Sequence, residues 1–567
     1  MTVALAGSGP ALEAVRVALA DVDESVRTTE ADEIDDADLA VVVARTGSET
    51  FSVANRTARA SDTPWLAVEL GGVGGVPVVD ASVAGFGPGT GCYACLERRV
   101  AANVESDAAP TAAPAAPIAR FAGALAGRRV VAFLQEEAPI FGSVVEVPHA
   151  ERRFLPVPNC ECDSADGVAL ADEDDDRSLE DALARAERGL DPRVGLLREV
   201  GEAESYPAPY YLATVSDTSG FSDATAARNA AGVDADWNAA FMKALGEGLE
   251  RYCAGVYRLD SYPADPVTER ADAVPPAEFV TMSDGDDESE PIHWADAESM
   301  ATGETVSVPA SFVHYPPQHR RWRPAITTGL GLGNSRAQAR LSGLYEVVER
   351  DAAMLAWYST YEPLELVVED ETYDALRRRA GAEGLDATAL LLTQDVDVPV
   401  VAVAVHRETF PKFALGSAAN LDPVAAARSA LAEAIQNWVE LDGMGPDGAT
   451  EASGDIGLYA NDPEIAWDHL GAESRIPADS VGPAPRPTVR AELDAVVSRV
   501  VDADLRPLAA RTTTRDVAAL GFEAVRVLVP SAQPLFFDSP YFGERAQTVP
   551  EAMGYEPKPG RRHHPFP

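Results

Sequence analysis

The stretch 341–351, LSGLYEVVERD, has the spacing of a helix whose polar groups gather on one side. Side chains three and four positions apart on a helix are neighbours, so Ser342, Glu346 and Glu349 share a face. Arg350 follows them directly. Carboxylates beside a guanidinium fit two interpretations: a solvated strip of salt bridges, or a site for a metal ion and a phosphate.

Two other stretches repeat this pattern, KALGEGLERYC at 243–253 and SALAEAIQNW at 429–438. The matching polar residues are Glu247, Glu250 and Arg251 in the first, and Glu433 and Gln436 in the second. Apolar residues are interleaved with them, which is typical of packed helices. Three related helices therefore predict that the carboxylates converge on a shared ligand.

The chemistry of this set indicates a magnesium–nucleotide site. Mg²⁺ takes oxygen ligands and shares them with phosphates, while arginine grips phosphate oxygens. No GxxxxGK[ST] sequence is present, so a P-loop is excluded. The glycine-rich stretch 327–339, TTGLGLGNSRAQA, could bring backbone close to a ligand. Asn334 lies where this stretch enters the second helix, as a ligand contact or a helix N-cap.

The composition limits the classes of function. The formal net charge is −45, and so acidic a surface repels nucleic acid and anionic membranes. Such charge suits solubility in a salt-rich, halophilic cytosol, with a basic partner as the alternative. No apolar run is long enough to span a membrane, and the N-terminus does not resemble a signal peptide. We therefore expect a cytoplasmic protein.

The first part of the chain alternates strand and helix patterns, which predicts an α/β domain with a degenerate Rossmann-like sheet. Its glycine turn at 7–10 is only weak support for a bound dinucleotide, because Leu12 stands where a third glycine belongs. Two cysteine pairs predict a closed structural zinc site; they are Cys92 with Cys95 and Cys160 with Cys162. A metal-free reduced cluster and a redox CxxC are the alternatives. The acidic connector 163–176 separates the expected domains, 1–165 and 178–567.

The three helix motifs, in this order, resemble those of the YcaO family. The helix motifs are EGLER at 247–251, SGLYEVVERD at 342–351 and SALAEAIQ at 429–436. The glycine stretch GLGLGN at 329–334, before the second of them, and YFGER and HHPFP near the C-terminus add to the resemblance. The resemblance implies an ATP-binding α/β fold of the family's own type. It also implies ATP- and Mg²⁺-dependent activation of a peptide backbone amide, which yields an azoline from Cys, Ser or Thr, or a thioamide with a sulfide donor.

The family pattern also assigns roles to residues of this chain. The implied Mg²⁺ ligands are Glu247, Glu250, Glu346 and Glu349; Arg350 and Arg251 would contact phosphate; Ser342, Asn334, Glu433 and Gln436 would line the nucleotide pocket. Lys243 and Gln338 depart from the pattern, which leaves the number of Mg²⁺ ions open. In azole-forming members a proline-rich tail brings its carboxylate to the active site, so Pro567 is the expected catalytic group. A disordered terminus is the alternative.

The first 165 residues resemble the E1-like, or ThiF-like, partner of azole-forming YcaO proteins. The stretches 7–10, 86–99 and 160–162 carry this resemblance. It implies a fused cyclodehydratase of thiazole/oxazole-modified peptide or bacteriocin biosynthesis, acting on a ribosomal precursor peptide. A separate leader-peptide-binding protein is a further expected partner, and the family leans towards a homodimer. The alternatives are a thioamide-forming enzyme with a TfuA-like partner, and a non-catalytic scaffold.

Overall fold

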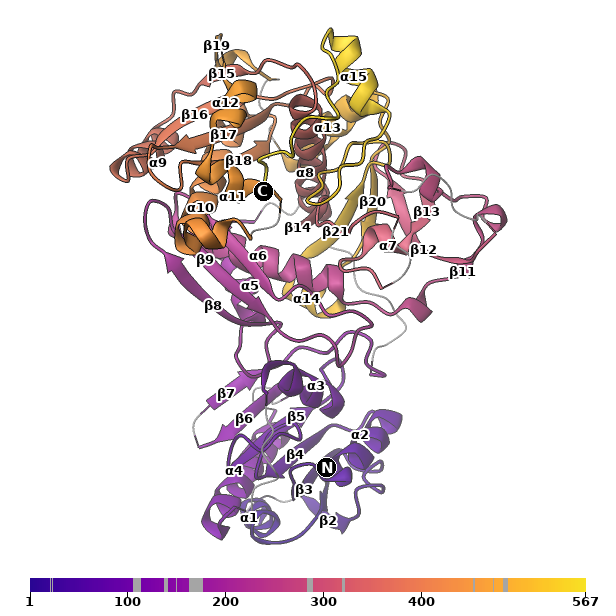
Figure 1. Ribbon diagram of the computed structural model, residues 1–567. Coiled ribbons are helices and arrows are strands. Elements are labelled where there is room, and N and C mark those ends of the chain that lie inside the picture. Colours follow the sequence, from indigo (N-terminus) through magenta and orange to yellow (C-terminus); the bar gives the residue numbers. More distant parts are fainter. Residues whose placement is uncertain are drawn as a thin grey trace. The chain divides into compact units, whose positions relative to one another are not determined.

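The N-terminal α/β pattern folds as a Rossmann-like sheet in a computed structural model of the protein (Figure 1). The structure describes residues 1–20, 22, 24–105, 114–136, 141–148, 150–162, 177–282, 289–318, 322–451, 454–472, 474–482 and 488–567. The chain folds into two compact units. The first is the N-terminal part together with Glu187–Glu199 and Val215–Ser222, and the second includes Val200–Thr214 and Asp223–Pro567.

The first unit is built on one sheet with the strand order β2-β1-β3-β4-β5-β6-β7. Strands β1 to β4 pair in parallel, and β5 to β7 continue the sheet antiparallel. Its elements are β1 (Thr2–Ala6), α1 (Pro10–Leu19), β2 (Ser25–Thr29), β3 (Leu39–Arg45), α2 (Glu49–Ser61), β4 (Trp65–Leu70), β5 (Ala81–Phe86), α3 (Tyr93–Asn103), α4 (Ala116–Leu134), β6 (Ser143–Val147) and β7 (Ala150–Arg153). Gly7 packs tightly here, since a Cβ would lie 2.2 Å from the Val43 carbonyl oxygen. Close packing thus accounts for this glycine.

The second unit contains three sheets. Their orders are β10-β9-β8, β11-β12-β20-β21-β14 with β13 beside β12, and β18-β17-β16-β15-β19. The strands are β8 (Leu197–Glu204), β9 (Tyr210–Val215), β10 (Asn229–Val233), β11 (Ala264–Asp265), β12 (Ile292–Ser299), β13 (Thr305–Pro309), β14 (Leu330–Gly333), β15 (Leu364–Val367), β16 (Asp386–Leu391), β17 (Val400–His406), β18 (Phe413–Ala419), β19 (Arg475–Pro477), β20 (Leu508–Arg511) and β21 (Glu523–Leu528).

The helices of this unit include the three expected from the sequence. They are α5 (Leu179–Ala186), α6 (Trp237–Gly255), α7 (Ala310–Val313), α8 (Arg336–Trp357), α9 (Glu371–Ala382), α10 (Pro423–Ala449), α11 (Ile456–Asn461), α12 (Glu464–Leu470), α13 (Val489–Asp502), α14 (Arg515–Leu520) and α15 (Arg545–Met553). Helices α6, α8 and α10 match the motif helices and pack on β10, β14 and β18 respectively. Each of these strands has a glycine pressed against its helix.

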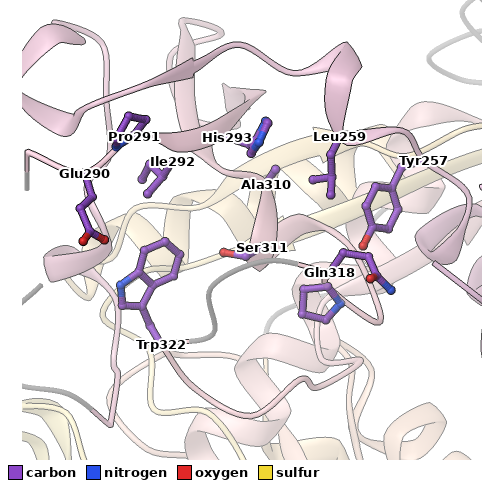
Figure 2. A pocket seen from close by; sticks show the side chains of 11 residues that line it. Tyr257, Leu259, Glu290, Pro291, Ile292, His293, Ala310, Ser311, Gln318 and Trp322 are labelled. Carbon is purple, nitrogen blue, oxygen red and sulfur yellow. The ribbon is translucent and has the colours of Figure 1, made fainter. Parts of the chain in front are cut away.

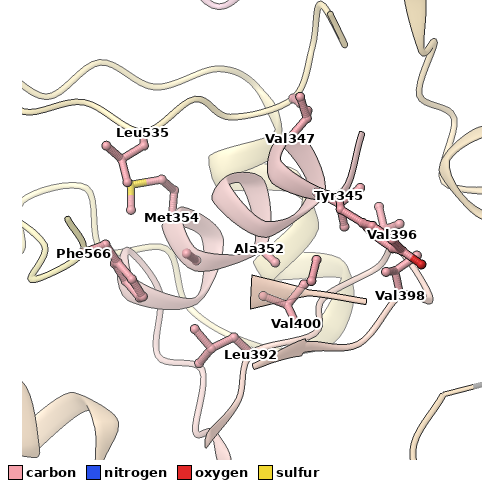
Figure 3. Close-up of a cluster of buried hydrophobic side chains, with 14 of the residues drawn as sticks. Tyr345, Val347, Ala352, Met354, Leu392, Val396, Val398, Val400, Leu535 and Phe566 are labelled. Carbon is pink, nitrogen blue, oxygen red and sulfur yellow. The ribbon is translucent and has the colours of Figure 1, made fainter. Parts of the chain in front are cut away.

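These glycines are Gly232, Gly331 and Gly416, where a Cβ would lie 2.3, 2.2 and 2.4 Å from a carbonyl oxygen of the facing helix. Such close approach excludes any side chain and fixes how each helix sits on its strand. Helix α8 packs against both larger sheets and lies between them (Figure 1). Figure 3 shows its apolar face against Leu392, Val398 and Val400. Helix α8, which carries the stretch 341–351, is therefore largely buried.

The boundary expected between 1–165 and 178–567 falls largely on residues outside the described part of the chain. The first unit also includes residues 187–199 and 215–222, which the sequence assigned to the second domain. Sequence patterns do not reveal this return, because it depends on hydrogen bonds between distant parts of the chain, such as Asn103 Nδ2 donating to the Gly195 carbonyl oxygen at 2.9 Å.

Candidate functional site

The first glutamate of each motif is held by the strand beside its helix. A main-chain N–H donates to its carboxylate in all three cases: Ala231 N to Glu247 Oε2 at 2.6 Å, Gly329 N to Glu346 Oε2 at 3.0 Å, and Ser417 N to Glu433 Oε2 at 2.7 Å. One oxygen of each carboxylate is therefore fixed by backbone. The three strand–helix pairs therefore share one local arrangement, in which a backbone hydrogen bond orients the carboxylate.

The carboxylates of the three helices influence one another electrostatically. Burial and, after it, the charge of Glu346 raise the pKa of Glu250 to about 8. The pKa of Glu349 is also raised to about 8, chiefly by burial, although Arg350 acts in the opposite direction. The pKa values of Glu247 and Glu433 are also raised, first by burial and with a contribution from Glu346. Glu346 thus lies near the other four, and the site carries more negative charge than its protein surroundings neutralise.

Among the described residues, the one group of three or more His, Cys, Asp or Glu side chains that could hold a metal ion as it stands is a set of four cysteines, whose ligand atoms lie within 4.8 Å of one another. The glutamates of the three helices do not form such a group. An open acidic site suits Mg²⁺, which keeps waters and completes its shell with substrate phosphates. The donor set therefore fits Mg²⁺ bound together with a nucleotide.

Arg350 connects this site to the end of the chain. Its Nη1 donates to the main-chain oxygen of Pro567 at 2.8 Å, and its Nε lies 3.6 Å from Glu349 Oε1. Burial alone would lower the pKa of Arg350, but Glu349, Glu433 and Glu346 outweigh that effect and raise it. The C-terminal residue is therefore beside the acidic helices, on a guanidinium that stays charged.

The tail is docked rather than disordered. Trp357 Nε1 donates to the Arg562 carbonyl oxygen at 2.9 Å, and the Tyr459 hydroxyl donates to that of His563 at 2.5 Å. Phe566 is 1% exposed and inserts into the core beside α8 (Figure 3). Because side chains of the core hold the preceding residues, the position of Pro567 is fixed from several directions.

Other expected site residues already have protein partners. Arg251 forms an ion pair with Glu247 and donates to the Asn229 carbonyl oxygen. Asn334 Oδ1 accepts a hydrogen bond from Arg185, so the amide oxygen of this side chain is already bound within the protein.

The helix N-cap, for which the sequence offered Asn334, is Ser335 instead, whose hydroxyl accepts from Gln338 N at 3.2 Å. Ser342 is exposed on α8 one turn before Glu346. Gln436 Nε2 donates to Glu440 Oε1 at 3.0 Å. Ser342 and Gln436 lie on the motif helices, as expected, whereas the N-cap of α8 is one position later than the sequence suggested.

Two arginines near the acidic residues were not predicted from the sequence: Arg526, which is buried, and Arg323, which is half-buried. Arg526 on β21 is 2% exposed, and its Nη atoms donate to the carbonyl oxygens of Ile326 and Thr327 at 2.9 and 2.7 Å. Burial and the nearby charge of Arg323 lower the pKa of Arg526 to about 9, while Glu346 and Glu250 act in the opposite direction. Its buried Nε has no hydrogen-bond partner among the residues that the structure describes. A lone arginine inside the apolar strand AVRVLV was the available signal.

The four cysteines meet in the first unit, and none of them forms a disulfide. The Sγ–Sγ distances are 3.9 Å for Cys92–Cys95, 3.7 Å for Cys92–Cys160 and 3.4 Å for Cys95–Cys162. A tetrahedron with Zn–S bonds of about 2.3 Å has sulfur separations of about 3.8 Å. The residues present therefore fit a structural zinc ion.

Comparison with known proteins identifies the family. Residues 231–533, just over half of the chain, match the model for YcaO cyclodehydratases, described as ATP- and Mg²⁺-binding. This chain belongs to the YcaO family. An uncharacterised protein of Methanothermobacter thermautotrophicus is 27% identical to this YcaO protein over 332 residues, 56% of this chain and 85% of the relative.

Solved structures share the fold. A heterocyclase in complex with substrate and cofactor aligns with a TM-score of 0.79 at 20% identity, covering all of this chain and 85% of the other. YcaO from Methanopyrus kandleri, bound with AMPPCP and Mg²⁺, aligns with a TM-score of 0.51 at 23% identity, over 63% of this chain and 91% of that one. The α/β fold and the family resemblance expected from the sequence are confirmed. No helix among the described residues is long and apolar enough to cross a membrane.

Proposed function

We propose that this YcaO protein uses ATP and Mg²⁺ to convert Cys, Ser or Thr residues of a ribosomal peptide into azolines. The observation that supports it most is the hydrogen bond from Arg350 to Pro567. It joins the helix that bears Glu346 and Glu349 to Pro567, which supports placing the proposed nucleotide site beside the proposed proton acceptor. The whole-chain likeness to a heterocyclase supports the same fold arrangement.

In the proposed reaction, the substrate's thiol or hydroxyl adds to the preceding carbonyl carbon. The resulting oxyanion takes the terminal phosphoryl group of ATP and ADP is released; phosphate then leaves as the former amide nitrogen loses its proton and the ring C=N bond forms. The terminal carboxylate of Pro567 is the proposed acceptor for the proton of the attacking group. An α-carboxylate is ionised at neutral pH, and the neighbouring Arg350 stabilises that form.

The acidic residues would hold the metal, and the arginines the phosphates. Glu247, Glu250, Glu346 and Glu349 are the proposed Mg²⁺ ligands, with Ser342, Asn334, Glu433 and Gln436 as the proposed lining of the nucleotide pocket. Arg350 and Arg526 are the proposed phosphate contacts, because Arg526 has a buried Nε with an unused donor. Bound Mg²⁺ supplies charge neutralisation at the phosphate oxygens. Arg251 would act mainly by orienting Glu247.

A structural zinc ion on Cys92, Cys95, Cys160 and Cys162 completes the proposal. Main-chain N–H of Val157 donates to Cys95 Sγ at 3.3 Å, and Asn55 Nδ2 donates to Cys92 Sγ at 3.7 Å. Such N–H···S contacts favour thiolates and commonly surround metal-bound sulfur.

The direct test is a reaction of the purified full chain with a Cys-containing precursor peptide, ATP and Mg²⁺, analysed by mass spectrometry. The proposal predicts loss of one water per modified residue, with one ADP formed each time. Replacement of oxygen by sulfur when sulfide is added would instead identify a thioamide-forming enzyme. An unmodified peptide, in the presence of its own leader-binding partner, would refute the proposed function.

Removing Pro565–Pro567 tests the role of the tail. We expect dehydration to fall by about 100-fold or more, the usual effect of losing a positioned proton acceptor, while ATP binding persists. Gly560→Ala is the matched control, since a Cβ at that tail position meets nothing within 4 Å. Equal activity of the truncated and full-length proteins would exclude Pro567 as a catalytic group.

A further inference from the structure

Arg545, the last residue of the YFGER stretch, forms ion pairs with two carboxylates. Its Nη2 lies 2.8 Å from both Asp351 Oδ2 and Asp395 Oδ1, and its Nη1 donates to Asp395 Oδ2 at 2.9 Å. Asp351 and Arg545 are both buried. Burial alone would lower the pKa of Arg545, but the two carboxylates outweigh that effect and raise it. Because Arg545 is the first residue of α15, this charged contact fixes α15 to α8.

Asp351 also holds the loop that precedes α15. The main-chain N–H of Gln533 donates to Asp351 Oδ1 at 2.7 Å. The side chain of Gln533 closes the loop, donating to the Tyr541 carbonyl oxygen at 3.0 Å and accepting from the Gly543 N–H at 2.8 Å. A clamp between α8 and the C-terminal segment is thus formed by four residues: Asp351, Asp395, Gln533 and Arg545.

The loop supports the C-terminal tail in turn. His564 Nε2 donates to the carbonyl oxygen of Phe536 at 2.6 Å. Figure 3 shows Leu535 of the loop and Phe566 of the tail on the same side of α8, beside Met354. The tail therefore rests on the loop as well as on the helix, and a shift of the loop would be passed on to the tail.

Consecutive residues of α8 hold the two ends of this C-terminal segment. Asp351 binds Arg545 where α15 begins, and Arg350 donates to the main-chain oxygen of Pro567 at 2.8 Å. Fixing one end of a segment raises the effective concentration of its other end at the site where that end docks. The ion pairs of Arg545 therefore favour the docked position of Pro567.

We propose that Arg545 is a positioning residue, whose ion pairs with Asp351 and Asp395 keep the terminal carboxylate of Pro567 docked at Arg350. The inference rests on the proposed function, in which that carboxylate accepts the proton of the attacking group. In this role Arg545 acts only through the tail. Its loss should slow dehydration and leave nucleotide binding intact.

The first test follows the tail itself, by hydrogen–deuterium exchange of the full chain without substrates. The amides of 556–566 report its docking; Lys558 N–H, for example, donates to the Tyr358 carbonyl oxygen at 2.6 Å. In Arg545→Ala these amides should exchange at least about ten-fold faster relative to those of α6, since hydrogen bonds to charged groups contribute this much. Arg545→Lys keeps the charge without the planar fork and should lie between the two. An equal change in the tail and in α6 would overturn the proposal.

Two variants control for general loss of stability. Arg377→Ala breaks an exposed ion pair with Asp374 on α9. His293→Ala removes a hydrogen bond from Nδ1 to the Tyr262 carbonyl oxygen, beside a cavity of about 250 Å³ that no clamp residue lines (Figure 2). Neither variant should change exchange in the tail more than in α6. A tail response as large as that of Arg545→Ala in either one would overturn the proposal.

The second test measures the reaction with a saturating Cys peptide, ATP and Mg²⁺. In Arg545→Ala, kcat for dehydration should fall at least about ten-fold, while the affinity for a non-hydrolysable ATP analogue stays within about two-fold of the wild type. In a chain that lacks Pro565–Pro567, the same substitution should cause no further loss, because the group that it positions is already absent. A smaller fall in kcat, weaker binding of the analogue, or a further loss in the truncated chain would overturn the proposal.

Asp395→Asn covers the case in which Arg545→Ala does not fold, because it leaves the contact between Arg545 and Asp351 in place. Exchange of the tail relative to α6 should then rise by about three-fold. Wild-type exchange in this variant would overturn the proposal. Failure of the proposed function is distinct: the wild type itself would then dehydrate no peptide, whereas the exchange measurement would still report the docking of the tail.

Discussion

At the scale of single residues, Glu346 is the point where the acidic groups meet. Its charge raises the pKa of Glu250 and adds to that of Glu349. Glu346→Gln should abolish ATP turnover and, because like-charge repulsion is relieved, raise the free energy of unfolding of the ligand-free protein by about 1 kcal/mol. Phosphate release and urea unfolding give the two values. Glu371→Gln, exposed at the start of α9, should change neither; a destabilised but active Glu346→Gln would contradict the assignment.

His314, outside the set of acidic residues, gives a further pH dependence. Its Nε2 accepts from the Tyr262 hydroxyl at 2.7 Å, its Nδ1 donates to the Ala254 carbonyl oxygen at 3.2 Å, and its ring stacks on Tyr257 at 4.0 Å. Burial lowers the pKa of His314 to about 4 from an ordinary value of 6.5. The folded protein thus keeps this ring neutral at pH values where the unfolded chain takes up a proton.

The stability contributed by neutral His314 is present above the unfolded pKa of 6.5 and is lost as the pH falls towards about 4. The full effect is about 3 kcal/mol. In His314→Phe, the curve of unfolding free energy against pH should be flatter over this range, as measured by urea unfolding at several pH values. A wild-type slope in the variant would show that His314 does not titrate in this way.

At the scale of elements, the glycines between strand and helix determine how the motif helices are placed. Gly331→Ala would put a Cβ 2.2 Å from the Ala339 carbonyl oxygen, so β14 and α8 must separate. We expect a loss of about 3 kcal/mol, measured as a lower Tm. Gly201→Ala is the control, because a Cβ there meets nothing within 4 Å. A Tm within the range of the control would show that the strand and helix are not tightly packed.

The same elements show what the sequence could and could not predict. Helical spacing located α6, α8 and α10 together with their glutamates, since a three- or four-residue period is a local signal. The hydrogen bonds from Ala231, Gly329 and Ser417 were not predictable, because each depends on a strand packing against its helix. Arg526 was missed for a similar reason. It lies on β21, where it pairs with Leu330 of β14, and this pairing between strands far apart in the sequence brings Arg526 to the site.

At the scale of the whole molecule, the chain combines two units with different stabilising features. The second has an extensive apolar core around α8, whereas the first is predicted to depend on zinc as well. Replacing Cys92 and Cys95 with Ser should remove one equivalent of zinc, measured by atomic emission, and lower the Tm of the first unit. Cys253→Ser, a buried thiol on α6, should leave the zinc content unchanged. A native protein without zinc would contradict this prediction.

The account depends most on the three motif helices forming one Mg²⁺–ATP site. The most direct measurement is calorimetric titration of the full chain with a non-hydrolysable ATP analogue, with and without Mg²⁺. Single variants test each helix: Glu250→Gln on α6, Glu349→Gln on α8 and Glu433→Gln on α10, with Glu371→Gln as control. We predict Mg²⁺-dependent binding that each of the three variants weakens by at least about ten-fold, since each removes a charged contact. Wild-type affinity in any one of the three would contradict a site shared by all three helices.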